Sequence, residues 1–507
     1  MVQSLRDQNV LVLGLGASGL AMARWCVRQG AHVTVLDTRE SPPMLATLKQ
    51  ELPHVLFAFA KMDASFLDNK TFSAVFSSPG LSPESTAALL EAARAAGVWV
   101  GGELSLYSLA LKELEIDTGY APKVLAITGT NGKTTVTALT GQLVQRAGKT
   151  VAVAGNIGPT LLDTLSAALE TQALPEVWVL ELSSFQLAQT SEFEPTAAVV
   201  LNLSQDHLDW HVDMADYAQA KVKIFGSTGL MILNRQDPAV MAMLPAPVRA
   251  KLQRPVERAH MTFGVDMPQR PGDFGLEDVN GMVWLVRALE ADETLKKSRN
   301  PQDQEIHIQR LMPADALRIR GRHNASNALA ALALCSSAGC ALGPILFGLR
   351  EYRGEPHRVQ SVATIDAVEY FDDSKGTNVG ATVAALCGLG EERKVVVILG
   401  GEGKGQNFTP LREPIAGFGR AVVLIGRDAP LIREALAELA VPIWDADSMQ
   451  TAVQIASEKA HNGDAILMSP ACASFDMFKN YEHRAEVFCD AVHSLALDAG
   501  IALEVQS

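Results

Sequence analysis

The sequence predicts an α/β protein of three domains, each built around a mostly parallel β-sheet. Short apolar stretches, typical of buried strands, alternate with amphipathic stretches typical of helices along most of the chain. Two glycine-rich motifs, at 14–19 and 128–135, each stand between a predicted strand and a predicted helix. The chain has 507 residues, and domains of about 150 residues are usual, so three domains fit its length.

Composition and charge exclude several classes of protein. Hydrophobic residues make up 48% of the chain and charged residues 20%, which is typical of globular proteins and excludes disordered and fibrous ones. The net charge of −14 opposes the broad basic surface that nucleic-acid binding requires, so we expect no nucleic-acid partner. The six cysteines form no CxxC pair, as is typical of reduced thiols, and no signal peptide is visible, so we expect a cytoplasmic protein.

The first domain is expected at 1–121. It opens with a predicted strand at 9–15, a helix at 19–29 and a second strand at 32–37, which together form a βαβ unit. A further strand is predicted at 74–77. A polar, charged stretch before the next strand marks the end of the domain.

The first glycine motif is a GxGxxG that runs from Gly14 to Gly19 between a strand and a helix. Glycines there let a pyrophosphate approach the helix N-terminus. Asp37 ends the next strand, where dinucleotide-binding folds carry an acid that binds a ribose. By itself the motif therefore indicates an NAD enzyme. The alternative is that these glycines only allow the strand and the helix to pack closely.

The second domain is expected at 122–354 and begins with a strand at 123–128. The second glycine motif follows at once and leads into a helix at 136–145. Backbone N–H groups and the helix dipole can hold phosphates there, Lys133 adds a positive charge, and the Thr134 hydroxyl can reach Mg²⁺. The leading glycine of the full Walker pattern is missing, so the motif predicts a shorter phosphate loop, with a plain turn as the alternative. The residues predicted to bind ATP here are Gly129, Thr130, Asn131, Gly132, Lys133, Thr134 and Thr135.

Polar residues follow two further predicted strands of the second domain. Glu181 lies at the end of the strand at 177–182, and Asp206 and His207 follow the strand at 197–203. The carboxyl ends of parallel strands form the edge of an α/β sheet at which ligands bind. A carboxylate at that edge suits Mg²⁺, so the pattern predicts a metal site beside the phosphate loop.

Other features of the second domain are predicted to be structural. Taken alone, His211 is expected to be an ordinary surface or cap residue, and Lys221 a solvated helix lysine. A polar insertion at 291–309 predicts a solvated loop. The uncharged stretch 328–349 has the length of a membrane span, but serines, glycines and a proline interrupt it. We therefore expect a buried helix, a turn and a second helix there, and no association with a membrane.

The third domain is expected at 355–507. Strands are predicted at 394–399, 421–425 and 465–469, and helical stretches separate them. This alternation again predicts a parallel sheet covered by helices.

Distinct motifs run in order along the whole chain: TGTNGKTT at 128–135, GNIG at 155–158, ELSSFQ at 181–186, Asp206-His207, RHNASNA at 322–328, His357-Arg358, DSKGTN at 373–378, GGEGK at 400–404 and SPACASFDMFKN at 469–480. Together they resemble the Mur ligase family, and most closely its D-glutamate-adding members. The loop at 128–135 alone would also fit folylpolyglutamate synthetases. The segments at 373–378 and 469–480 carry the specific part of the resemblance.

The resemblance implies an N-terminal Rossmann-like domain that binds UDP, a central P-loop ATPase-like α/β domain, and a C-terminal Rossmann-like domain that closes on ATP and D-glutamate. It also reassigns the first glycine motif from NAD to a UDP-linked sugar. The residues implied for the UDP substrate are Gly16, Asp37, Thr38, Arg39, Ser78, Gly80, Asn156 and His207.

The resemblance further implies ATP and two Mg²⁺ ions as cofactors. The implied metal residues are Thr134, Glu181, His207 and Lys221, and the implied catalytic residues are Lys133, Glu181, His207, Lys221 and Lys404. Lys221 resembles the family's carbamylated lysine, and a carbamate would explain how a lysine helps to position a cation. Further ATP contacts are implied at Asn324, Asn327, Arg358 and Asp373. The alternative for Asn327 is that it caps the following helix.

D-Glutamate is implied to bind at Lys375, Thr377, Lys404, Ser474, Phe475 and Tyr481. Lysine suits the recognition of carboxylates. For Phe475 and Tyr481, the alternative is that they belong to the hydrophobic core. The sequence departs from the family pattern at 372–376, which is DDSKG where many relatives carry NDSKA. It is also longer around 243–315, and we expect this length to form a tolerated surface loop, with a partner contact as the alternative.

The implied reaction joins D-glutamate to UDP-N-acetylmuramoyl-L-alanine, uses ATP, and passes through an acyl phosphate during the synthesis of peptidoglycan precursors. The expected partners are these three small molecules, and the protein is expected to be a monomer. Two alternatives stay open: another Mur-type or folylpolyglutamate-type amino-acid ligase, and an NAD-binding oxidoreductase indicated by the GxGxxG motif and Asp37. A non-catalytic interaction protein would not need the assembled phosphate and metal residues.

Overall fold

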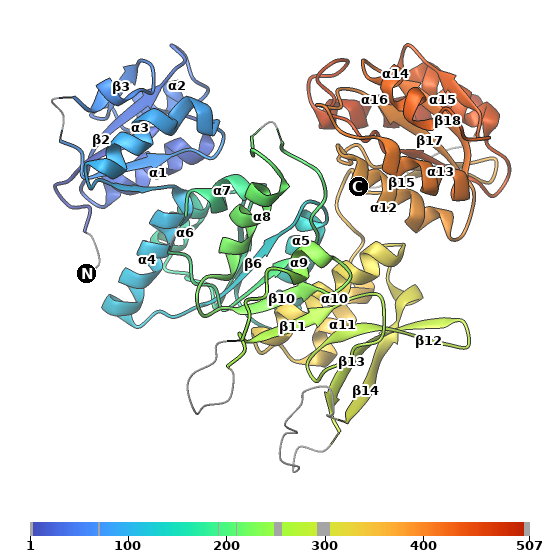
Figure 1. Ribbon diagram of the computed structural model, residues 1–507, viewed down its shortest axis with the longest axis horizontal. Coiled ribbons are helices and arrows are strands. Elements are labelled where there is room, and N and C mark those ends of the chain that lie inside the picture. The colour runs from blue at the N-terminus through green and yellow to red at the C-terminus, as the bar shows by residue number, and fades with distance from the viewer. Residues whose placement is uncertain are drawn as a thin grey trace.

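Three sheet-centred parts make up the chain in the computed structural model (Figure 1). The N-terminal part and the C-terminal part lie on opposite sides of the central part, which connects them. The structure describes residues 4–68, 71–190, 192–208, 210–247, 256–291 and 305–500.

The N-terminal part is a five-stranded parallel sheet in the order β3-β2-β1-β4-β5. The predicted βαβ start is confirmed, and the central strand β1 is buried because helices cover both faces. The strands are β1 (Asn9–Leu13), β2 (His32–Asp37), β3 (Leu56–Phe59), β4 (Ala74–Ser77) and β5 (Trp99–Gly101), and the helices are α1 (Ala17–Arg28), α2 (Leu45–Glu51), the 3-10 helix η1 (Ala64–Leu67) and α3 (Pro83–Ala95).

The central part contains a six-stranded parallel sheet in the order β11-β10-β9-β6-β8-β7. Side chains along its strands alternate between two cores, one with α4 and α6 and the other with α5, α10 and α11. The strands are β6 (Lys123–Thr128), β7 (Val151–Gly155), β8 (Val177–Glu181), β9 (Ala197–Val200), β10 (Leu230–Asn234) and β11 (His260–Phe263). The helices are α4 (Glu103–Thr118), α5 (Lys133–Arg146), α6 (Leu161–Glu170), α7 (Ser184–Ala188), α8 (Met214–Val222), η2 (Lys223–Phe225), α9 (Pro238–Met241), η4 (Ala314–Ala316), α10 (Arg322–Ser337) and α11 (Leu342–Glu351).

A small antiparallel sheet follows β11 and corrects two expectations from the sequence. Strands β12 (Phe274–Val279), β13 (Met282–Glu290) and β14 (Ile306–Pro313) pair in that order, so the added length around 243–315 is not simply a surface loop. The loop predicted at 291–309 is wrong at its end, where 306–309 belong to β14, and 292–304 lie outside the described residues. Asn280 and Gly281, both with positive φ, form the turn between β12 and β13, and an Asn-Gly pair is a strong signal for such a hairpin.

The C-terminal part is a six-stranded sheet in the order β15-β16-β20-β17-β18-β19, parallel except for the β15–β16 pair. The predicted strands are confirmed to within two residues at each end. The strands are β15 (Gln360–Ile365), β16 (Val368–Asp372), β17 (Val395–Gly400), β18 (Gly419–Ile425), β19 (Ile443–Asp445) and β20 (Ala465–Met468), and the helices are α12 (Val379–Gly390), η5 (Thr409–Leu411), α13 (Arg412–Phe418), α14 (Ala429–Leu436), α15 (Met449–Lys459) and α16 (Tyr481–Asp498).

The uncharged stretch at 328–349 forms the buried end of α10, a turn and most of α11, as the sequence predicted. Across the part of the chain that the structure describes, no helix combines the length and the apolar character that a membrane crossing needs. The predicted domain limits after 121 and after 354 fall between the sheets, although α4, before the first limit, packs against both α1 and α6.

Candidate functional site

The site begins at the carboxyl edge of the central sheet. Strand β6 pairs with β8 on one side and with β9 on the other, and all three run in the same direction. The segments that follow them therefore leave the sheet side by side. These segments carry the phosphate loop after β6, Glu181 at the end of β8, and Asp206 and His207 after β9.

The phosphate loop has a backbone that requires glycine at two positions. Gly129 has φ +154°, and a Cβ there would lie 2.9 Å from the Cβ of Leu201. Gly132 has φ +83°, and a Cβ there would lie 2.7 Å from Asn327 Oδ1. Asn202 holds the loop, because its side-chain oxygen accepts from the N–H of Asn131 at 2.8 Å. The loop therefore has a defined shape and leads directly into α5, whose first N–H groups can face a phosphate.

Lys133 lies at the start of α5 and folds back over the loop. Its Nζ donates to the carbonyl oxygens of Gly129 at 2.8 Å and Thr130 at 2.7 Å. Burial lowers the pKa of this lysine, and the charges of Glu181 and Asp206 oppose the shift. The lysine thus lies within the fields of both carboxylates, on the same side of the sheet as Glu181.

Glu181 presents a carboxylate oxygen with no protein partner. Its side chain is 1% exposed, and Oε1 accepts from Asn156 Nδ2 at 2.9 Å. The other oxygen, Oε2, is buried without a hydrogen bond. A buried, unpartnered carboxylate oxygen is costly and suits a cation. Within the described ranges no group of three or more His, Cys, Asp or Glu side chains could hold a metal, so a cation here would also need oxygen ligands from a phosphate or from water.

The other predicted metal residues fit this cation unequally. The Thr134 hydroxyl accepts from Arg358 Nη2 at 2.5 Å, so Arg358 occupies one side of it. His207 is 40% exposed and lies 3.7 Å from Asp206, measured from Nε2 to Oδ2. An imidazole nitrogen is a poor ligand for Mg²⁺, which prefers oxygen. Thr134 and Glu181 therefore fit Mg²⁺ best.

Lys221 is not the solvated helix lysine that its sequence position predicts when taken alone. Its side chain is 1% exposed, and Nζ donates to Thr128 Oγ1 at 3.1 Å and to the Gly129 carbonyl at 3.0 Å. Burial, and then the charge of Lys133, hold the pKa of Lys221 well below its usual value. An ammonium cannot bind a cation, so Lys221 would need a change of chemical form to take part in the metal site.

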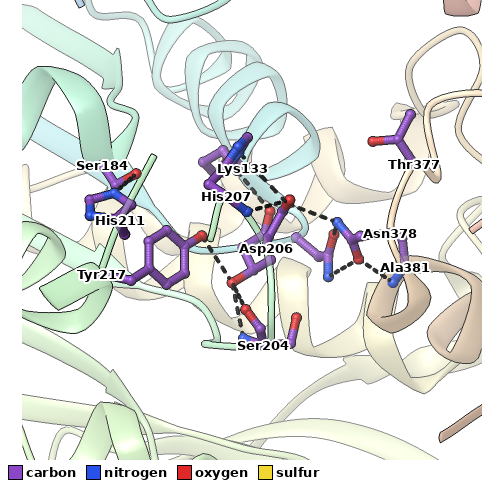
Figure 2. Close-up of polar contacts among 12 residues, drawn as sticks. Lys133, Ser184, Ser204, Asp206, His207, His211, Tyr217, Thr377, Asn378 and Ala381 are labelled. Atoms are coloured by element: carbon purple, nitrogen blue, oxygen red, sulfur yellow. Dashed lines mark hydrogen bonds and ion pairs between the residues drawn. The ribbon is translucent and has the colours of Figure 1, made fainter. Parts of the chain in front are cut away.

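His211 is also not a surface residue. It is 2% exposed, and its Nε2 lies 2.9 Å from Ser184 Oγ (Figure 2). Its Nδ1 lies 2.8 Å from the Asp216 carboxylate. The ring of Phe185 packs between this histidine and His207. His211 therefore fixes α7 against the segment that carries His207, which the sequence did not indicate.

Most of the residues predicted to bind ATP line a cavity of about 350 Å³ between the central and C-terminal parts, but Gly129, Thr130, Lys133 and Thr134 are not among its lining residues. Those that line it are Asn131, Gly132, Thr135, Asn324, Asn327, Arg358 and Asp373. The alternative that Asn327 caps a helix is wrong, because α10 begins at Arg322 with Gly321 before it. His323 also lines the cavity, and the sequence analysis missed it.

Asp373 and Glu355 are acidic residues of this cavity, and Asp373 is the buried one. Burial raises its pKa from the usual 3.8 to about 7, although a hydrogen bond from Ser469 Oγ at 2.6 Å acts in the opposite direction. The following Gly376 lies so close that a Cβ would be 2.5 Å from Asp373 Oδ2. Many relatives carry alanine at position 376. The glycine of this chain therefore fits a backbone that passes close to the Asp373 carboxylate.

Six of the residues predicted for the UDP substrate lie at the carboxyl ends of β1, β2 and β4, whereas Asn156 and His207 lie in the central part, after β7 and β9. Asp37 is buried and accepts from the N–H of Leu15 at 2.7 Å and from the Arg39 guanidinium at 2.8 Å. Burial alone would raise its pKa, but these hydrogen bonds lower it. A Cβ added at Gly16 or at Gly80 would meet no atom within 4 Å, so both positions leave room for a ligand.

This arrangement weakens the NAD hypothesis for the GxGxxG motif. Each oxygen of Asp37 already accepts two hydrogen bonds, from Arg39 and Leu15, so Asp37 fits a role in positioning Arg39 and the loop after β1 better than a direct contact with the ribose of NAD or of UDP. Gly19 serves close packing, because a Cβ there would lie 1.9 Å from the Gly14 carbonyl oxygen. Thr38 and Arg39 are exposed and Ser78 is buried beside Gly14, so the predicted UDP residues of the N-terminal part gather at one edge of its sheet.

The residues predicted for D-glutamate come from the loops after β16, β17 and β20, which are neighbours in the C-terminal sheet. Lys375 Nζ lies 5.0 Å from the centre of the Tyr481 ring. Lys404 is exposed with φ +51°, and Ser474 is buried. Phe475 is 66% exposed, so the alternative that it belongs to the core is wrong. Thr377 lies at the edge of the network in Figure 2, with no dashed contact to the other residues drawn.

Comparisons with known proteins match three family models in order along the chain. They are "Mur ligase MurD-like, N-terminal domain" at 8–102, "Mur ligase middle domain" at 127–335 and "Mur ligase, glutamate ligase domain" at 357–472. The UDP-N-acetylmuramoylalanine–D-glutamate ligase of Albidiferax ferrireducens is 66% identical, and the match covers 99% of each chain. That of Cupriavidus metallidurans is 55% identical over 98% of this chain and 99% of the relative.

Solved structures with the same fold share much less sequence. The UDP-N-acetylmuramate-alanine ligase MurC from Thermotoga maritima has a TM-score of 0.53 at 19% identity, over 96% of this chain and 100% of that one. MurF from Acinetobacter baumannii has a TM-score of 0.56 at 16% identity, over 97% and 92%. These likenesses confirm the predicted three-domain α/β fold.

Proposed function

The chain belongs to the Mur ligase family, and from that premise we propose that it joins D-glutamate to UDP-N-acetylmuramoyl-L-alanine in an ATP-dependent step of peptidoglycan precursor synthesis. The observation that carries this assignment is the full-length match, at 66% identity, to a relative named for that activity. The site geometry supports the same assignment, because the phosphate loop with Lys133 lies beside the buried Glu181 carboxylate, whose Oε2 has no hydrogen bond.

The reaction must overcome the poor reactivity of a carboxylate toward an amine at neutral pH. We propose that the L-alanyl carboxylate oxygen attacks the γ-phosphorus of ATP, so that ADP leaves and an acyl phosphate forms. The amine of D-glutamate then attacks the acyl carbon, loses a proton and displaces phosphate. Lys133 and Arg358, which both border the phosphate loop, neutralise the charge that builds on the phosphoryl oxygens.

Magnesium would be held by Glu181 Oε2 and by the Thr134 hydroxyl, with phosphate oxygens and water completing its coordination. Bound there, the metal neutralises phosphate charge and orients the γ-phosphate. A second ion near His207 belongs to the same proposal, with the neighbouring Asp206 carboxylate and phosphate oxygens as its ligands in preference to the imidazole. Carbamylation of Lys221 is supported by its burial and lowered pKa, since only a neutral amine reacts with carbon dioxide.

Each part of the chain has one role in this proposal. Residues 1–121 bind the UDP moiety, 122–354 bind ATP, and 355–507 contribute to the ATP and D-glutamate sites. The cavity between the second and third parts, and the loops after β16, β17 and β20, support this division. We place the reaction in the cytoplasm, where ATP and UDP-linked sugars are available, and expect a monomer.

The test is phosphate release by the purified protein with ATP, Mg²⁺, UDP-N-acetylmuramoyl-L-alanine and a panel of amino acids. We expect release with D-glutamate and not with L-glutamate or L-alanine. Release with L-glutamate but not D-glutamate would indicate a folylpolyglutamate-type or other Mur-type ligase instead. Saturable NAD binding with no phosphate release would favour the oxidoreductase alternative.

A further inference from the structure

One side chain, Asn378, connects the phosphate loop to the C-terminal part. It forms a reciprocal amide pair with Asn131 of the loop: Asn131 Nδ2 donates to Asn378 Oδ1 at 3.2 Å, and Asn378 Nδ2 donates to Asn131 Oδ1 at 3.0 Å. Asn378 Nδ2 also donates to Asp206 Oδ2 at 3.2 Å (Figure 2). Since Asn378 is 5% exposed, these contacts are shielded from water.

Asn378 is at the same time the N-cap of α12. Its Oδ1 accepts from the N–H of Ala381 at 2.9 Å, which fixes the first turn of the helix. The helix start is thus tied to two segments of the central part, the phosphate loop through Asn131 and the segment after β9 through Asp206. Thr377, predicted for D-glutamate, immediately precedes this cap.

A second amide, Gln406, continues the connection on the other side of the helix start. Its Oε1 accepts from the N–H of Val379, the first residue of α12, at 3.0 Å. Its Nε2 lies 3.1 Å from the carbonyl oxygen of Gly403, 3.4 Å from that of Ala471 and 3.5 Å from that of Thr377. One side chain therefore touches all three loops that carry the residues predicted for D-glutamate.

We propose that Asn378 and Gln406 are positioning residues that hold the three D-glutamate-binding loops in register with the phosphate loop. The inference rests on the proposed function, because it assigns these loops to D-glutamate. Neither amide needs to touch a substrate. Their role is to place the incoming amine near the acyl phosphate, where misplacement by about 1 Å is enough to slow a reaction severely.

The variants that test this keep the local fold intact. Asn378→Ser retains an oxygen that caps α12 but is too short to reach Asn131 and Asp206. Gln406→Glu has nearly the same shape and keeps the acceptor for Val379, but it replaces the Nε2 donor by an oxygen that faces three carbonyl oxygens.

Two matched controls lie at the N-cap and on the exposed face of α15, outside these loops. Ser448→Ala removes the N-cap of α15, which is held by a hydrogen bond from Thr451. Gln454→Glu makes the same change as Gln406→Glu on an exposed face of that helix. A general loss of stability or an added charge would affect the controls as much as the test variants.

The measurements are kcat and KM for D-glutamate, and the dissociation constant for an ATP analogue in the absence of D-glutamate. For each test variant we expect kcat/KM for D-glutamate to fall at least about tenfold, which is the size of effect expected when buried carbonyls lose a donor. Nucleotide affinity should stay within about threefold, because Asn202 still holds the loop. If the two amides act as one unit, the double variant should have a kcat/KM for D-glutamate close to that of the more impaired single variant.

Test variants with unchanged kcat/KM for D-glutamate beside an active wild type would overturn this inference alone. Equal losses in nucleotide affinity and D-glutamate kinetics, or losses matched by the controls, would also overturn it, because they indicate a general structural role. A wild type that releases no phosphate with D-glutamate would overturn the proposed function and this inference together.

Discussion

Charged side chains with incomplete pairing gather where β6, β8 and β9 end. Glu181 has one oxygen without a partner, and Lys133 donates to neutral carbonyl oxygens of the loop. Burying such groups costs free energy unless a counter-charge arrives. A triphosphate and its cation would supply both missing charges, so these residues favour ligand binding over the stability of the empty protein.

Lys133 is the residue whose removal is most informative. We expect Lys133→Ala to reduce ATP-dependent phosphate release by about a hundred- to a thousandfold, as is typical when one group that stabilises transition-state charge is lost. Lys394→Ala is the matched control, because Lys394 also donates to a backbone carbonyl, that of Gly417, on the surface. Equal turnover in wild type and Lys133→Ala would refute the role of Lys133.

Glu103 at the start of α4 provides a pH prediction. It is 2% exposed and accepts from the N–H of Leu162 at 3.1 Å, and burial raises its pKa from 4.5 to about 7. The folded protein therefore retains a proton that the unfolded chain loses, so this group's contribution to stability falls as pH rises from about 4.5 to about 7.

The matching variant is Glu103→Gln, which keeps the acceptor for Leu162 and does not ionise. From pH 5 to pH 8, the wild type should lose on the order of 2 kcal/mol of unfolding free energy relative to the variant. Urea unfolding at both pH values measures this difference. Parallel pH profiles for the two proteins would show that Glu103 ionises normally in the folded state.

The phosphate loop and helix α5 together form the element that shapes the nucleotide site. Its shape depends on positive φ at Gly132 and on the contact of this residue with Asn327 from α10. Helix α10 thereby forms one wall of the nucleotide cavity, and its alanine-rich sequence lets it pack closely against α5.

The substitution Gly132→Ala, which adds one methyl group to the phosphate loop, tests the role of this element in nucleotide binding. Gly132→Ala should raise the dissociation constant for ATP at least about tenfold, because the αL conformation costs an L-residue about 1–2 kcal/mol and the Cβ would meet Asn327. Gly148→Ala is the control: Gly148 follows the other end of α5 with nearly the same φ, +82°, and has nothing within 4 Å of the added Cβ. Similar nucleotide affinities in the two variants would contradict the close fit at Gly132.

Most strands and the order of the motifs could be predicted from the sequence, because buried parallel strands are continuous apolar runs. The small sheet of β12, β13 and β14 was missed, although Asn280-Gly281 signalled its hairpin. The burial of Lys221 and His211 could not be predicted, because their partners lie 93 and 27 residues away in the chain. The same holds for Asn378 and Asn131, which are 247 residues apart.

At the scale of the whole molecule, a few polar contacts connect the three parts. Arg24 of α1 pairs with Asp163 of α6 at 3.2 Å, and Trp210 Nε1 donates to the Leu81 carbonyl at 3.3 Å. On the other side, Arg358 reaches Thr134 and Asn378 reaches Asn131. The N-terminal and central parts also share an apolar core around α1, α4 and α6, whereas polar contacts such as these join the C-terminal part, so substrates at this second junction can draw the parts together.

ATP is proposed to lie on the loop around Lys133, with magnesium at Glu181. A crystal structure with Mg²⁺ and a non-hydrolysable ATP analogue would show both positions. We predict the γ-phosphate within hydrogen-bond distance of Lys133 Nζ, and the ion about 2.1 Å from Glu181 Oε2. A nucleotide bound elsewhere, or a Glu181 carboxylate that does not contact the ion, would contradict the account.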